Sequence, residues 1–177
     1  MLAAFAVGWL VNVDPVSELR LDWNDALLGV LFALPLLALF LATHHLSFEP
    51  IQRINRFLID SIGPFLASCR VVDLILLATL AGVCEEIVFR GFLQPWIGRL
   101  GATAGLIGSN IVFALAHFVT PTYAIAAFLI GIYLALLMQF DDSPNLLVPI
   151  ITHAVYDFVA FLVIVRTYRQ QRSGSVL

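Results

Sequence analysis

The sequence predicts an all-α, polytopic bundle of about five to six transmembrane helices, with one further amphipathic helix at the membrane interface. Hydrophobic residues make up 61% of the chain and charged residues only 12%, whereas soluble domains carry about 25% charged residues. The apolar residues also fall into long runs separated by short polar turns. So few charges would not cover the surface of a water-soluble protein of this size. The small net charge of −3 argues against a nucleic-acid partner.

The N-terminal region, residues 1–70, begins with two apolar segments. A partial helix is expected at Met1–Val11. It is too short to cross a bilayer, which needs about 20 apolar residues, and it lacks the features of a signal peptide. It therefore indicates the remainder of a helix that starts upstream. A second helix is expected at Ala26–Thr43, with a kink at Pro35 and interfacial histidines at His44 and His45. The loop between the two segments is acidic and holds Asp14, Glu18, Asp22 and Asp25.

The segment Phe48–Ala67 has a different pattern. Apolar residues recur at helical spacing, and charged residues fall between them. This pattern predicts an amphipathic helix that lies in the membrane interface rather than crossing the bilayer. The alternative is an ordinary connecting helix in water. The residues that carry the pattern are Ile51, Ile54, Leu58 and Ile62 on one face and Arg53, Arg56 and Asp60 on the other.

The region 71–165 is expected to form the core of the bundle, followed by a basic C-terminal tail at 166–177, all within one domain. Gly101, Pro121 and the polar turn at 141–145 punctuate its apolar runs. Cys69 and Cys84 have neither disulfide nor zinc-site spacing and are expected to be packing residues. The expected core helices are Val71–Leu93, Ala102–Phe118, Tyr123–Phe140 and Leu146–Val165.

The arginines predict an orientation in the membrane, because basic loops stay on the cytoplasmic side. Six of them flank the core helices on what we expect to be the cytoplasmic side, which places the C-terminus in the cytoplasm and the acidic loops outside. Arg20 and Arg99 run against this rule. The expected location is a bacterial inner membrane. The six arginines are Arg53, Arg56, Arg70, Arg166, Arg169 and Arg172.

Ionisable residues inside the apolar runs are few, and each is a candidate for a functional site because burying charge in lipid is costly. In the run Glu85-Glu86-Ile87-Val88-Phe89-Arg90, Glu86 and Arg90 are four residues apart, with the carboxylate on the favourable N-terminal side for an ion pair. Glu85 points elsewhere and has no partner on its own helix. An unpaired carboxylate in an apolar site suits a general base.

Two further pairs have the same four-residue spacing. His153 and Asp157 share a face of the last expected helix, so the carboxylate can orient the imidazole. Phe113 and His117 share a face of another. Each pair also has a structural explanation: Glu86–Arg90 and His153–Asp157 as packing contacts, and His117 as an interfacial histidine. These structural explanations are less convincing when the pairs are considered together, because the ionisable groups lie on three helices that can converge.

The three motifs, in this order, resemble the CPBP family of CAAX proteases and bacteriocin-processing enzymes, also called the Abi family. The family pattern is E-E-x-x-x-R, then F-x-x-x-H, then H-x-x-x-N or H-x-x-x-D. Here it is matched by Glu85-Glu86…Arg90, Phe113…His117 and His153…Asp157. Gly91 and the Leu147–Ile150 segment also look family-like, and the resemblance covers roughly Val71–Val165.

The resemblance implies an intramembrane endopeptidase without a cofactor. Glu85 is implied as the general base that activates water, with His117 holding that water. His153 and Asp157 would stabilise the oxyanion, and Glu86, Arg90 and Phe113 would support the site. Where Asp157 replaces Asn, it would either have to be protonated or act by orienting His153. The implied partners are a peptide or protein substrate in or near the membrane and the lipid bilayer itself.

Other interpretations remain open from the residues alone. Glu85, His117, His153 and Asp157 offer enough oxygen and nitrogen ligands for a divalent metal, although no H-E-x-x-H signature is present. A transporter or channel, or an inactive relative acting as a scaffold or immunity factor, would also place charges in the membrane. Straight helices would put Glu85 near mid-membrane and His117 near the cytoplasmic end of its helix, so their meeting requires tilted, bent or differently placed helices.

Overall fold

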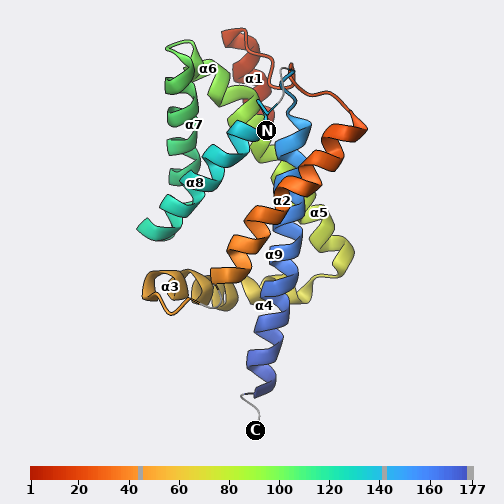
Figure 1. Cartoon of the computed structure of the whole chain (residues 1–177), viewed down its shortest axis with the longest axis vertical. Helices are drawn as coiled ribbons and strands as arrows, with labels where there is room; N and C mark the ends of the chain where they lie inside the picture. Colours follow the sequence, from red (N-terminus) through yellow and green to blue (C-terminus); the bar gives the residue numbers. More distant parts are fainter. Residues whose placement is uncertain (44–45, 141–142, 175–177) are drawn as a thin grey trace.

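The computed structural model describes residues 1–43, 46–140 and 143–174, and every regular element in these ranges is helical (Figure 1). His44, His45, Asp141 and Asp142 lie outside the described residues. The predicted all-α class is thus confirmed. The elements are α1 (Leu2–Val11), α2 (Trp23–Thr43), α3 (Glu49–Phe57), the π-helix η1 (Leu58–Ile62), α4 (Gly63–Ser68), α5 (Val71–Glu86), the π-helix η2 (Ile87–Leu93), α6 (Gln94–Gly98), α7 (Ala102–Ala116), α8 (Pro121–Leu137) and α9 (Leu147–Gly174).

Local capping explains where several helices begin and end. α2 starts three residues before the predicted Ala26, because the Asp22 carboxylate accepts hydrogen bonds from the backbone N–H groups of Asn24 and Asp25. α8 starts at Pro121 because the Thr120 hydroxyl accepts from the N–H of Tyr123, and proline suits the first helical turn. Gly101 has φ of +127°, a conformation that favours glycine, and separates α6 from α7.

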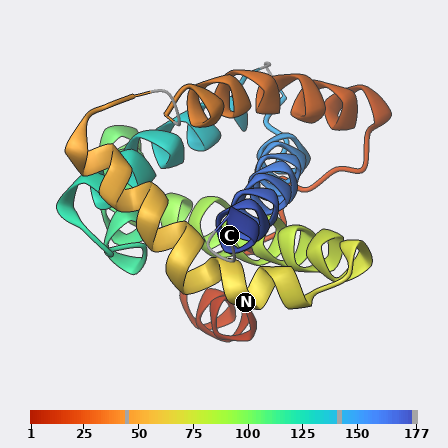
Figure 2. The ribbon, with the colours of Figure 1, turned by 90° about the horizontal axis from the view of Figure 1, so that it is seen from below.

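Helix α9 is the centre of the molecule, with α2 and α5 packed along its sides (Figures 1 and 2). Two glycines allow this close packing. A Cβ on Gly29 of α2 would lie 2.7 Å from Cβ of Ile151, and a Cβ on Gly82 of α5 would lie 3.0 Å from the backbone of Ala154. α9 also continues to Gly174, beyond the predicted end at Val165, so its arginines lie on a helix rather than in an extended tail.

Residues Val71–Leu93 are helical as predicted, but part of this range is not α-helical and the helical run continues beyond Leu93. Helical structure runs without a break through α5, η2 and α6, and its middle section is π-helical rather than α-helical. The prediction assumed a regular α-helix to Leu93. The π-helical section begins directly after Glu86, and π-helical turns occur often at functional sites.

Two of the described helices are long and apolar enough to cross a membrane, α2 and α9. α7 and α8 are apolar but have 15 and 17 residues, so at 1.5 Å per residue they are about 22 and 25 Å long. Judged by length, two of the described helices can cross a membrane, which is fewer than the five to six predicted. The Phe48–Ala67 segment is helical as predicted, and α3 and α4 lie across one end of the bundle, with Ile54, Ile59 and Leu66 buried (Figure 2).

Candidate active site

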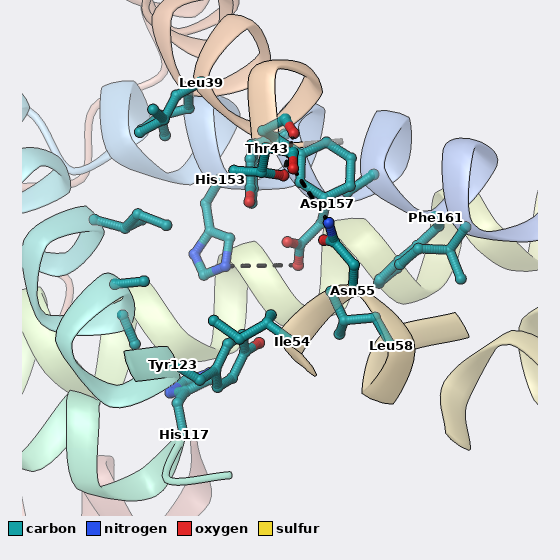
Figure 3. Close-up of a pocket in the computed structure, with 18 of the residues that line it drawn as sticks. Leu39, Thr43, Ile54, Asn55, Leu58, His117, Tyr123, His153, Asp157 and Phe161 are labelled. Atoms are coloured by element: carbon teal, nitrogen blue, oxygen red, sulfur yellow. Dashed lines mark hydrogen bonds and ion pairs between the residues drawn. The ribbon is translucent and has the colours of Figure 1, made fainter. Parts of the chain in front are cut away.

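The polar residues identified from the sequence meet at one place, where the end of α5, the end of α7 and the N-terminal half of α9 come together. Oε2 of Glu85 lies 3.6 Å from Nε2 of His117 and 3.9 Å from Nε2 of His153. Nε2 of His153 lies 3.6 Å from Oδ2 of Asp157 (Figure 3). Residues that are up to 72 positions apart in the chain thus form a single cluster.

Short helices explain how His117 reaches Glu85. α7 is shorter than the roughly 30 Å hydrocarbon layer, so its C-terminal end stops partway along the bundle. α8 turns back from there, and α3 lies beyond that turn (Figure 1). His117 is the residue after the last turn of α7, with φ −100° and ψ 17°. His117 thus lies at the end of its helix, as predicted, and the helix placement brings it close to Glu85.

Glu86 and Arg90 form a buried ion pair, as their spacing predicted. Nη1 of Arg90 lies 3.0 Å from Oε1 of Glu86, and both side chains are fully buried. Nη2 of Arg90 also donates to the side-chain oxygen of Asn110 and the carbonyl of Gly131, at 3.1 and 2.7 Å. The guanidinium lies 4.7 Å from the centre of the Phe113 ring. These contacts anchor α7 and α8 to the helical run formed by α5 and η2.

His153 has a contact that the sequence analysis missed. Its Nδ1 lies 2.8 Å from Oε1 of Glu86, a short hydrogen bond between α9 and α5. Since a carboxylate only accepts, Nδ1 carries the proton and Nε2 faces Glu85 and Asp157. Glu86 therefore holds His153 directly, in addition to its pairing with Arg90.

Asn110 and Gly131 were also missed. Asn110 is fully buried, and its amide donates 2.8 Å to the carbonyl of Leu106, which directs its oxygen toward Arg90. A buried amide in an apolar helix was the available signal. A Cβ on Gly131 would lie 2.3 Å from that same amide oxygen, so only glycine fits beside Arg90. The sequence does not indicate that the carbonyl of Gly131 accepts this hydrogen bond, because every residue has a backbone carbonyl.

His117 is held in a defined tautomer. Its Nδ1 lies 2.9 Å from the carbonyl of Phe113, and a carbonyl only accepts, so Nδ1–H donates. Its ring packs 4.3 Å from the ring of Phe113. Nε2 then faces the Glu85 carboxylate with a lone pair. The distance of 3.6 Å is longer than a direct hydrogen bond.

Glu85 differs from its neighbour in its surroundings. Oε2 of Glu85 is buried but has no hydrogen-bond partner among the described residues. The side chain as a whole is 30% exposed, whereas that of Glu86 is fully buried. A carboxylate oxygen that faces two imidazole nitrogens and is otherwise unbonded is placed to accept a proton from a bound water.

A cavity of about 210 Å³ opens in front of the cluster. Its wall is mainly apolar and includes the polar side chains of His117, Tyr123, His153 and Asp157 (Figure 3). α2 and α8 both line it, and Ile54 and Asn55 of α3 and Leu58 of η1 add to its wall. The cavity is therefore a mainly apolar space beside the polar cluster.

The described residues contain no group of three or more His, Cys, Asp or Glu side chains arranged to hold a metal ion. In the cluster, Nδ1 of His153 is already bonded to Glu86, and Nδ1 of His117 to a backbone carbonyl. Four potential ligand atoms remain: Oε2 of Glu85, Nε2 of each histidine and Oδ2 of Asp157. The distances are 3.6 Å from Oε2 of Glu85 to Nε2 of His117, 3.9 Å from Oε2 of Glu85 to Nε2 of His153, and 3.6 Å from Nε2 of His153 to Oδ2 of Asp157.

Comparison with known families gives one match. A family model described as type II CAAX prenyl endopeptidase Rce1-like matches residues 67–159, just over half of the chain. The matched range contains Glu85, Glu86, Arg90, Phe113, His117, His153 and Asp157. Neither a curated protein nor a solved structure matches the chain.

Proposed function

Because the chain belongs to the Rce1-like family, part of the CPBP family of membrane-embedded proteases, we propose that it hydrolyses a peptide bond within or near the bilayer, with Glu85 as general base. The observation that carries this proposal is the position of Oε2 of Glu85, which is buried, faces both Nε2 atoms and has no other partner among the described residues.

The proposed reaction begins with a water between Glu85 and His117. It donates one hydrogen bond to Oε2 of Glu85 and one to the lone pair on Nε2 of His117. Glu85 takes a proton as the water oxygen attacks the carbonyl carbon of the scissile bond. The tetrahedral intermediate carries its negative charge on the former carbonyl oxygen. Glu85 then returns the proton to the leaving amine as the carbon–nitrogen bond breaks.

His153 and Asp157 are proposed to stabilise that oxyanion. With Nδ1 donating to Glu86, a protonated His153 presents Nε2–H toward the cavity. Asp157 stands 3.6 Å from Nε2 and supports the positive charge of the imidazolium. This assigns Asp157 the orienting role, which an ionised carboxylate can fill, rather than donation to the oxyanion.

The cavity is proposed as the substrate site, reached laterally from the bilayer between α2 and α8. Near the C-terminal end of α8, the Tyr133 hydroxyl donates a 2.9 Å hydrogen bond to the carbonyl of Phe32 in the middle of α2, and Phe32 packs on Phe140, just after α8. Toward α3, apolar side chains of both helices line the cavity. An apolar segment of a membrane-bound peptide can therefore enter without crossing water.

The proposed setting is a bacterial inner membrane with the C-terminus in the cytoplasm. About five to six membrane helices are proposed, with α7 and α8 entering the bilayer without crossing it fully and α3 and α4 in the interface. Irregular backbone at membrane depth is tolerated where it lines a protein cavity, as the end of α7 at His117 does.

The test is an unbiased map of new peptide termini in host membranes that contain either the wild type or Glu85→Gln at matched expression. Replacing a general base is expected to lower cleavage by about 10²–10⁴-fold. Glu49→Gln is the matched control, because Glu49 is an exposed glutamate on α3 that pairs only with arginines. Termini that appear with the wild type and Glu49→Gln, but not with Glu85→Gln, would identify the substrates.

Repeating the terminus map in the presence of a chelator distinguishes a metal-independent protease from a metal-dependent one. Termini that persist in chelator support a glutamate protease that needs no metal, and termini that vanish support a metal-dependent membrane protease that uses the same residues. Identical termini from the wild type and Glu85→Gln would overturn the protease proposal in favour of a transporter or scaffold.

A further inference from the structure

The catalytic cluster is rich in hydrogen-bond acceptors and poor in donors. An ionised Glu85 or Asp157 only accepts, and Nε2 of His117 presents a lone pair because Nδ1 carries the proton. Among these four residues, Nε2–H of a protonated His153 is therefore the donor available to the oxyanion of the proposed reaction. Oxyanion holes commonly combine two donors. A second donor has to come from another part of the cavity wall.

Four other polar side chains in the described part of the chain line the cavity, and two of them have a free donor hydroxyl. The hydroxyl of Thr43 already donates to the carbonyl of Phe40 at 2.6 Å, and the amide of Asn55 donates to the carbonyl of Thr43 at 3.4 Å. The hydroxyls of Tyr123 and Tyr156 have no hydrogen-bond partner among the described residues. Neither belongs to the unpaired atoms that are closed off from their surroundings. Both can therefore donate to a ligand in the cavity.

The positions of the two tyrosines distinguish them. Tyr156 lies on α9, and its ring packs edge-on against Phe40 of α2, with 6.0 Å between the ring centres. The electrostatic effect of Asp157 reaches both hydroxyls, and that of Glu85 reaches Tyr123. Figure 3 shows the ring of Tyr123 reaching from α8 into the cavity next to His117. Tyr123 is therefore the tyrosine that lies by the general base as well as by Asp157.

The backbone of Tyr123 is held by the turn that follows His117. Its N–H donates to the hydroxyl of Thr120 at 3.1 Å, which caps the first turn of α8. Farther along the same helix, the carbonyl of Gly131 accepts a hydrogen bond from Arg90. A donor on an anchored helix needs little reorganisation when negative charge develops near it, which is the requirement for stabilising an oxyanion.

We propose that the hydroxyl of Tyr123 donates a second hydrogen bond to the oxyanion, together with Nε2–H of His153. This inference rests on the proposed function. The hydroxyl keeps its proton throughout. Its hydrogen bond strengthens as negative charge develops on the carbonyl oxygen of the substrate, and it weakens when the carbon–nitrogen bond breaks and the carbonyl returns. Because Tyr123 is on α8 and His153 is on α9, the reacting carbonyl oxygen is bound between these two helices.

Tyr123→Phe tests the proposal, because it removes the hydroxyl and keeps the ring. The probes are synthetic peptides that span the cleavage sites identified by the terminus map, with the full chain in lipid nanodiscs. Loss of one oxyanion donor is expected to lower kcat by about 10²–10³-fold. KM is expected to change by less than about threefold, because the lost hydrogen bond forms mainly in the transition state.

The matched control is Tyr168→Phe. Tyr168 lies on α9 outside the cavity, and its hydroxyl accepts a hydrogen bond from Arg172. Its kcat is expected to stay within about twofold of the wild type. Thermal unfolding of both variants verifies that the fold is kept. Tyr156→Phe tests the other free hydroxyl: a large fall in its kcat, with normal kcat in Tyr123→Phe, would overturn the assignment to Tyr123.

The kinetic pattern separates failure of this inference from failure of the proposed function. Wild-type kcat in Tyr123→Phe, with Glu85→Gln inactive on the same peptides, would overturn the role of Tyr123 and leave the protease proposal standing. A rise in KM alone would assign Tyr123 to ground-state binding and would also overturn its role at the oxyanion. Equal cleavage by the wild type and Glu85→Gln would overturn both proposals.

Discussion

Arg90 is the residue on which the buried polar network depends. It joins Glu86 on its own helical run, Asn110 on α7 and the carbonyl of Gly131 on α8, and it packs over Phe113. Glu86 in turn holds His153. A single guanidinium thus joins three helical segments, and through Glu86 it is linked to His153 on a fourth, α9. Its removal would leave the Glu86 carboxylate buried without its counter-charge.

The first prediction concerns stability. Arg90→Met is expected to lower the free energy of unfolding by about 3–5 kcal/mol, because breaking a buried pair from one side leaves an uncompensated charge. Arg53→Met is the control, since Arg53 pairs with Glu49 while both side chains are more than half exposed, and such pairs contribute about 0–1 kcal/mol. Unfolding in detergent micelles measures both.

A double variant tests the reason given. Glu86→Gln combined with Arg90→Met removes both charges and is expected to be more stable than Arg90→Met alone. If the double variant is as unstable as the single one, the loss comes from packing and from the bonds to Asn110 and Gly131, and the uncompensated carboxylate is not its cause.

At the scale of the helices, hydropathy and spacing located most elements to within a few residues. Apolar length predicted α2, α7, α8 and α9, and helical periodicity predicted the α3–α4 segment. The four-residue spacing predicted the Glu86–Arg90 pair, which is formed. Such features are local, so sequence neighbours decide them.

The parts that escaped prediction depend on how helices meet. The bond between Glu86 and His153 joins residues 67 positions apart, and nothing within either helix favours it. The meeting of His117 with Glu85 depends on α7 ending partway along the bundle. Apolar composition alone does not distinguish a short helix that lines a cavity from a helix that crosses the whole membrane. The π-helical section after Glu86 likewise has no signal in hydropathy.

The second prediction concerns the cavity between α2, α3 and α8. Ile54→Trp on α3 places a larger ring in the wall and is expected to lower kcat/KM for a substrate identified by the terminus map at least about tenfold, or about 1.4 kcal/mol. The matched control is Arg53→Trp, on the exposed side of the same helix. Thermal unfolding of both variants verifies that the fold is kept.

Leu39→Trp gives the same test from α2, where the side chain lines the cavity but is 61% exposed, so a larger ring need not disturb the core. Loss of cleavage in both cavity variants supports a substrate site. Full activity in both would mean that the substrate reaches Glu85 by another route.

At the scale of the whole molecule, charge is divided between the two ends of the bundle. Arg53, Arg56 and Arg70 lie around α3 and α4, and the three arginines of α9 extend from the same end (Figure 1). The acidic loop after α1 lies at the other end. This division is the one that the positive-inside rule uses to orient a membrane protein.

The two arginines at the acidic end are both bonded to backbone carbonyls. Arg20 donates to the carbonyls of Ser143 and Pro144, and Arg99 donates to those of Val11 and Asn12. They therefore stabilise the loops of the folded protein at this end, a role that does not depend on the positive-inside rule.

The third prediction concerns orientation. A fluorescent protein fused after Leu177 is expected to fold and fluoresce, and alkaline phosphatase fused at the same point is expected to be inactive, because the positive-inside rule predicts that an arginine-rich end stays in the cytoplasm. Replacing Arg166, Arg169 and Arg172 together with glutamine is expected to raise phosphatase activity, whereas replacing Arg20 and Arg99 is not, because those two act on folded loops rather than on insertion. High phosphatase activity in the unmodified fusion would place the C-terminus outside. The active site would then face membrane substrates from the opposite side, and the catalytic geometry around Glu85 would be unaffected.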